Sequence, residues 1–87
     1  MQRLLTATAR LVPAGEVDEQ AWRAPLTPRE QETAVLLAKG ASNKEIARQL
    51  EITERTVKAH VGAMLEKLGA RDRLQLSLII NGIENPR

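Results

Sequence analysis

The fold is decided by residues 42–69, which read SNKEIARQLEITERTVKAHVGAMLEKLG. The sequence predicts a short helix over 43–50, a connection of three residues at 51–53 and a longer helix over 54–68 that ends at Gly69. A short helix, a tight turn and a longer helix form the helix-turn-helix outline. Because many helical bundles contain such a pair, the outline alone indicates an all-α fold and leaves the function open.

Helix start and stop signals also mark the boundaries of further helices outside residues 42–69. Thr27–Glu30 is a capping box with proline at the first helical position, and Gly40 is a stop signal. Ser42–Glu45 repeats the box, and Asp72 with Gln75 opens a last helix. Strand signals are nearly absent, since Phe and Tyr are missing. We therefore expect four helices, at 28–39, 43–50, 54–68 and 72–83.

The first 25 residues differ from the rest in composition. Residues 3–12 can form an amphipathic helix, whereas 13–25 contain Pro13, Gly15 and Pro25 among mixed charges and are interpreted as a linker. With 87 residues, the chain has room for one compact domain, which we assign to 26–87. We interpret residues 1–25 as an extension left from the final helix and linker of a preceding domain; a disordered tail is an open alternative.

The helix predicted over 54–68 has two contrasting faces. One face is an apolar stripe at the helical period, made of Val57, Val61, Met64, Leu65 and Leu68. The opposite face carries Arg55, Lys58, Ala59, Gly62 and Glu66. Lys58 can donate to guanine and Ala59 can contact a thymine methyl group, while small residues allow close approach to base edges. An ordinary solvated face explains the same residues equally well.

Composition excludes several classes of function. The chain has no cysteine and a single histidine, His60, so we expect no disulfide, no metal site and no cofactor. No nucleophile–base pair or glycine-rich phosphate loop is present, and we expect no enzyme activity. No apolar run approaches the ~20 residues of a membrane helix, so a cytoplasmic location without a membrane partner is expected. The net charge of +2 arises in residues 42–73, where seven basic residues face five acidic ones, a weak signal for nucleic acid.

Four motifs together resemble the LuxR/FixJ-type helix-turn-helix, the output domain of many response regulators and quorum-sensing receptors. They read LTPRE at 26–30, GASNKEIA at 40–47, TVKAH at 56–60 and KLG at 67–69. The similarity extends over 26–83. It implies an all-α, four-helix domain that binds double-stranded DNA and regulates transcription.

The resemblance also implies roles for single residues. Base edges are read from Lys58, Ala59 and Gly62. Phosphate contacts, or contacts that hold the helix in register, come from Ser42, Asn43, Lys44, Thr53, Arg55, Thr56, His60 and Lys67. Glu30 matches a position that is largely internal in the family. The chain departs from the family pattern at Thr33 and Ala34, where we expect a looser core, and at Gly62, where a longer polar side chain is common.

The last predicted helix has more aliphatic residues than one core-facing stripe can use. We expect Leu76, Ile79, Ile80 and Ile83 to face the core, and we assign Leu74 and Leu78 to a homodimer interface, as the family tends to dimerise through this helix. The alternative is that both faces are buried beneath the N-terminal segment.

These observations predict a sequence-specific transcriptional regulator that acts as the output domain of a two-component response regulator. A receiver domain in a longer protein and RNA polymerase are the further partners that this interpretation implies. A stand-alone regulator of the same family, a promoter-binding domain of the sigma-factor type and a protein-interaction module are the alternatives.

Overall fold

The computed structural model describes residues 21–84, which form a short 3-10 helix and four α-helices. These elements are η1 (Ala21–Arg23), α2 (Pro28–Ala38), α3 (Asn43–Leu50), α4 (Glu54–Leu68) and α5 (Arg73–Ile80). The all-α prediction is confirmed. The helix expected over 3–12, and the linker up to residue 20, lie outside the described residues.

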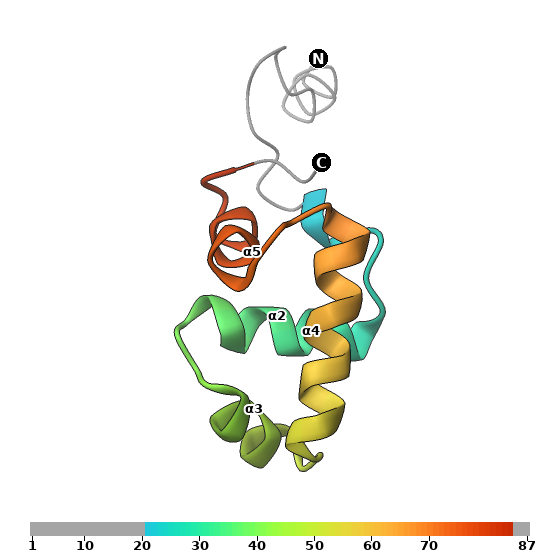
Figure 1. Cartoon of the computed structure of the whole chain (residues 1–87), viewed down its shortest axis with the longest axis vertical. Helices are drawn as coiled ribbons and strands as arrows, with labels where there is room; N and C mark the ends of the chain where they lie inside the picture. Colours follow the sequence, from blue (N-terminus) through green and yellow to red (C-terminus); the bar gives the residue numbers. More distant parts are fainter. Residues whose placement is uncertain (1–20, 85–87) are drawn as a thin grey trace, which may run out of the picture.

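The longest helix, α4, runs along one side of the domain, and α2 crosses it (Figure 1). The helix α3 packs against α4 near the end where α4 begins, whereas α5 lies toward the opposite end of the molecule. Within residues 21–84, no helix is both long enough and apolar enough to cross a membrane.

Every α-helix begins at the capping residue that the sequence predicts. The hydroxyl groups of Thr27, Ser42 and Thr53 accept hydrogen bonds from backbone N–H groups three residues later, as does the Asp72 carboxylate. In the first two caps the bond is reciprocated, since the Glu30 and Glu45 carboxylates accept from the N–H groups of Thr27 and Ser42 at 2.9 and 2.7 Å. Each cap contributes about 1 kcal/mol to helix stability.

The end of the last helix differs from the prediction. The helix α5 ends at Ile80 and not at residue 83, because Gly82 takes the left-handed conformation with φ +80°. The Ile83 N–H donates to the Leu78 carbonyl at 2.8 Å, so Ile83 lies in a turn and is 64% exposed. The prediction that Ile83 faces the core is therefore wrong.

The core lies between the four α-helices and includes the apolar stripe of α4. Its buried members are Trp22, Leu26, Ala34, Leu37, Ile46, Ala47, Val57, Val61, Met64, Leu68, Leu76, Ile79 and Ile80. Thr33 is also fully buried, and its hydroxyl donates to the Arg29 carbonyl at 3.0 Å, so this polar side chain adds no unpaired group to the core. Trp22 comes from the stretch interpreted as a linker, yet it is only 3% exposed, so this stretch contributes to the core.

Candidate nucleic-acid interface

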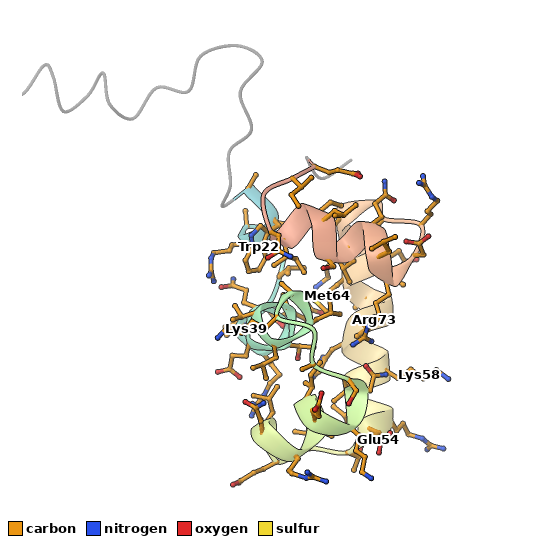
Figure 2. The ribbon with its side chains drawn as sticks, turned by 90° about the vertical axis from the view of Figure 1, so that its left-hand side faces the viewer. Trp22, Lys39, Glu54, Lys58, Met64 and Arg73 are labelled. Atoms are coloured by element: carbon orange, nitrogen blue, oxygen red, sulfur yellow. The ribbon has the colours of Figure 1, made fainter. Side chains whose placement is uncertain are left out.

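The three residues assigned to base reading all lie on the exposed side of α4. Lys58, Ala59 and Gly62 are exposed, whereas Val57 and Val61 beside them are buried. Figure 2 shows Lys58 pointing away from the other helices. A Cβ atom at Gly62 would have no heavy atom within 4 Å, so this part of α4 is open to an approaching partner. This side of α4 therefore presents the long cationic side chain of Lys58 beside two minimal ones.

Two threonines form a hydrogen-bonded pair at the start of α4. The Thr53 hydroxyl accepts from the Thr56 N–H at 3.0 Å and donates to the Thr56 hydroxyl oxygen at 2.9 Å. The hydroxyl hydrogen of Thr53 is therefore engaged within the cap. The Thr56 hydroxyl keeps its own hydrogen for an external acceptor such as a phosphate oxygen. Arg55 is exposed and His60 is half-buried on the same helix.

The start of α3 is a second candidate contact. Ser42 and Lys44 are exposed and Asn43 is half-buried. The capping box engages the N–H groups of Ser42 and Glu45, and helix geometry leaves those of Asn43 and Lys44 without an intrahelical acceptor. Free N–H groups and the positive end of the helix dipole favour an anion at this position.

Lys67 has an internal partner in the structure. Its Nζ lies 2.8 Å from Oε1 of Glu30, and this ion pair joins α4 to α2. The Glu30 side chain is 8% exposed, so the structural role that we assigned to Glu30 is confirmed. The predicted phosphate contact of Lys67 would have to share its ammonium group with this buried carboxylate.

Acid should weaken the domain through Glu30. Burial alone would raise the pKa of this carboxyl, but hydrogen bonds from Lys67 and from the Thr27 N–H outweigh burial and hold the pKa below its ordinary value of 4.5. The unfolded chain therefore binds this proton more readily than the folded chain does. The contribution of Glu30 to stability is present above pH 4.5 and is lost as the pH falls through the lower folded pKa.

Urea unfolding of the parent and of Glu30→Gln should show this effect, with a smaller loss of unfolding free energy in acid for the variant. Glu32→Gln is the control, because the Arg29–Glu32 pair has the same 2.8 Å separation but is about half exposed. If Glu30→Gln and the parent lose stability in parallel, the ion pair with Lys67 does not hold Glu30 in its charged form.

Replacing Gly62 by alanine should stabilise the chain by about 1 kcal/mol, since alanine favours the helix interior and the added methyl group meets open space. Gly69→Ala is the matched control. It makes the same chemical change at φ +67°, where a side chain is strained, and should destabilise the chain. Thermal unfolding followed by circular dichroism measures both changes, and a destabilised Gly62→Ala would mean that position 62 is packed.

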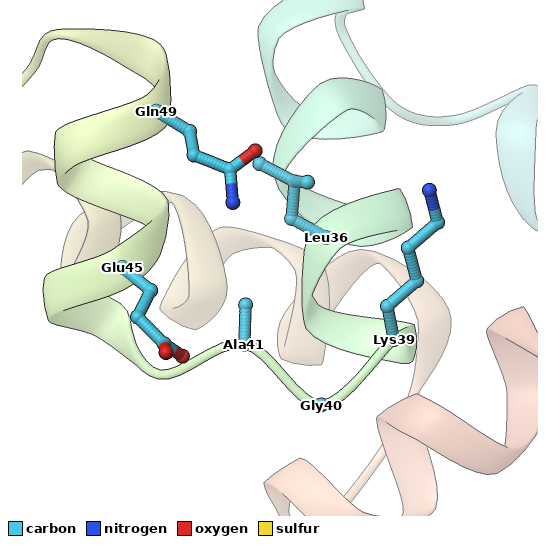
Figure 3. Close-up of a pocket in the computed structure, with 6 residues that line it drawn as sticks. All are labelled: Leu36, Lys39, Gly40, Ala41, Glu45 and Gln49. Carbon is cyan, nitrogen blue, oxygen red and sulfur yellow. The ribbon is translucent and has the colours of Figure 1, made fainter.

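A hollow between the end of α2 and α3 is lined by Leu36, Lys39, Gly40, Ala41, Glu45 and Gln49 (Figure 3). Glu45 is the acidic group of this lining, and its carboxylate is engaged in the cap with Ser42. Hydrogen bonds from the backbone and side chain of Ser42 lower the pKa of Glu45, so the carboxylate stays charged in this role. The predicted capping role of Glu45 is confirmed.

Sequence reasoning missed one residue near this interface. Arg73, the first residue of α5, donates from one guanidinium nitrogen to Oδ1 of Asn43 at 2.6 Å and from another to the Ala41 carbonyl at 2.9 Å. These partners lie 30 and 32 positions away, so no local pattern could have indicated them.

Comparison with known proteins identifies the family of this domain. The family model "Bacterial regulatory proteins, luxR family" matches residues 24–80. The nitrate/nitrite response regulator protein NarL of Escherichia coli K12 is 46% identical over 56 residues, which are 64% of this chain and 26% of NarL. The response regulator protein VraR of Staphylococcus aureus Mu3 is 54% identical over 50 residues, which are 58% of this chain and 24% of VraR.

The chain thus spans about a quarter of the length of these relatives. The matched residues 24–80 include all of α2, α3, α4 and α5, and hence both elements of the helix-turn-helix. The chain belongs to the luxR family of bacterial regulatory proteins and contains its DNA-binding helix-turn-helix domain.

Proposed function

We propose that the domain reads a promoter by placing the first half of α4 in the major groove. The observation that carries this proposal is the pattern of exposure along α4. Four residues of the apolar stripe are buried and Leu65 is partly buried, whereas the outward side presents Lys58 beside Ala59 and Gly62. A helix that enters the groove needs a bare, basic surface near its N-terminus, and Lys58 can donate to guanine O6 and N7.

Phosphate contacts around the groove would fix the position of α4. We assign them to Ser42, Asn43, Lys44, Thr53, Arg55, Thr56, His60 and Lys67. The free N–H groups at the start of α3 and the hydroxyl hydrogen of Thr56 support this assignment. Lys67 stands apart from the others, because its ammonium group is already paired with Glu30.

A homodimer through α5 is the second part of the proposal. Leu74 is 69% exposed and Leu78 is half-buried, whereas Leu76, Ile79 and Ile80 of the same helix are buried. Leu74 and Leu78 are four residues apart, so they lie together on the outer side of α5, and a shared apolar surface of this kind favours a partner there. A two-fold pair would place two copies of α4 about one turn of DNA apart, roughly 34 Å, on an approximately palindromic site.

We infer that the domain is the output part of a response regulator. NarL and VraR, of which the chain matches about a quarter, are both response regulators. A receiver domain in a longer protein, RNA polymerase at the promoter and action in the cytoplasm belong to this proposal. A stand-alone regulator of the same family is the second candidate, and the domain organisation of the complete gene product distinguishes the two.

Selection of bound sites from a pool of random DNA duplexes tests whether the domain recognises a specific DNA sequence. We expect enrichment of a site with two half-sites about 10 base pairs apart, and binding that weakens steeply as salt rises. Failure to enrich any sequence, with binding independent of salt, would favour a protein-interaction module.

A further inference from the structure

Arg73 connects the start of α5 to the start of α3. Figure 2 shows its side chain reaching from α5 toward the lower part of the molecule, on the same side of this view as Lys58. One Nη atom donates to Asn43 Oδ1 at 2.6 Å, and the other donates to the Ala41 carbonyl at 2.9 Å. Arg73 thereby holds both the first residue of α3 and the loop that leads into it.

The bond from Arg73 fixes which way the Asn43 amide points. A carboxamide has an oxygen that accepts and an NH₂ group that donates. A half-turn of the amide exchanges the positions of these two groups, so the hydrogen-bond partners decide which group faces which neighbour. Guanidinium has only donors, so the oxygen of Asn43 must face Arg73 and the NH₂ group must face away from it. This NH₂ group therefore belongs to the same helix end as the free backbone N–H groups of Asn43 and Lys44.

We propose that Arg73 is a positioning residue for the DNA backbone. It turns the Asn43 NH₂ group toward a phosphate and holds the Ala41 carbonyl, so that α3 begins in the correct place, without contacting DNA itself. This inference rests on the proposed function, in which Asn43 contacts a phosphate. It differs from that proposal because Arg73 acts through Asn43 from another helix.

The test is a double-mutant cycle in DNA affinity with Arg73→Met, Asn43→Ala and the double variant. The probes are a labelled duplex that carries the enriched site and a labelled random-sequence duplex at low salt. We expect Arg73→Met to weaken binding to both probes by the same factor, roughly tenfold, because a phosphate contact carries no sequence information. The double variant should bind about as weakly as Arg73→Met alone.

Arg71→Met is the matched control, because it removes the same charge two residues earlier from an exposed side chain. It should lower affinity much less than Arg73→Met does. Additive effects of Arg73→Met and Asn43→Ala would overturn the inference, since they would mean that Arg73 contacts DNA independently. An equal loss in Arg71→Met would overturn it as well, because charge alone would then explain the effect.

Nuclear magnetic resonance of the parent chain gives a second readout that does not depend on the folding of any variant. On addition of the random-sequence duplex, the side-chain NH₂ signal of Asn43 should shift while the Arg73 guanidinium signals keep their positions. A shift of the guanidinium signals with an unchanged Asn43 NH₂ signal would contradict the inference. A parent chain that binds neither duplex would refute the proposed function itself, which separates the two failures.

Discussion

Leu76→Glu should leave the chain unfolded at 25 °C. Leu76 is fully buried in α5, and its replacement removes apolar packing worth about 2–5 kcal/mol. A carboxylate without a partner in the core adds several kcal/mol. A domain of this size has a total stability of only about 5–10 kcal/mol. Far-ultraviolet circular dichroism should show the loss of helix and of a cooperative melting transition.

Leu78→Glu is the matched control on the same helix. Leu78 is half-buried, so the new carboxylate can reach water and the chain should remain folded. If α5 forms the dimer, this variant should be monomeric by sedimentation at concentrations where the parent dimerises. Unfolding of both variants, together with a parent that is monomeric even on DNA, would mean that α5 is wholly internal and would refute the dimer.

Lys58→Ala should weaken binding to the enriched site by about 1–3 kcal/mol, roughly five- to 150-fold, and relax the preference at one base pair. Lys58 is exposed and points away from the domain, so the substitution should leave the melting temperature unchanged. The measurement is a repeated site selection together with affinities for matched and mismatched duplexes.

Lys39→Ala is the control for Lys58→Ala. Lys39 is also an exposed lysine, but it lies on the opposite side of the molecule in the view of Figure 2. Its removal should change affinity slightly and equally for all sequences. If Lys58→Ala selects the same DNA sites as the parent chain, Lys58 does not read a base.

The starts of the helices could be predicted because caps are local. Thr27 and Ser42 each lie three residues from the glutamate that completes the box, so the sequence contains the whole interaction. The end of α5 was missed although its signal is present. Asn81 and Gly82 form a typical helix stop, and the aliphatic residue that follows them was assigned to the helix despite that stop.

The exposed face of α4 could also be predicted, since helical periodicity separates Lys58 from the buried stripe. The side-chain interactions between different helices could not be predicted. Lys67 and Glu30 are 37 positions apart, and Arg73 and Asn43 are 30 apart. Such pairs depend on how α2, α3, α4 and α5 pack, and helical periodicity carries no information about that packing. Trp22 is a further case, because an isolated aromatic residue between prolines and charges resembles a linker until its burial is seen.

Entry of the first half of α4 into the groove is tested most directly by nuclear magnetic resonance of the ¹⁵N-labelled chain titrated with the enriched duplex. We expect the largest changes in backbone amide shifts over 53–62 and at the start of α3, with smaller changes over the second half of α4 and in α5 beyond Arg73. Changes concentrated in α5, with the amides of Lys58, Ala59 and Gly62 unmoved, would contradict it.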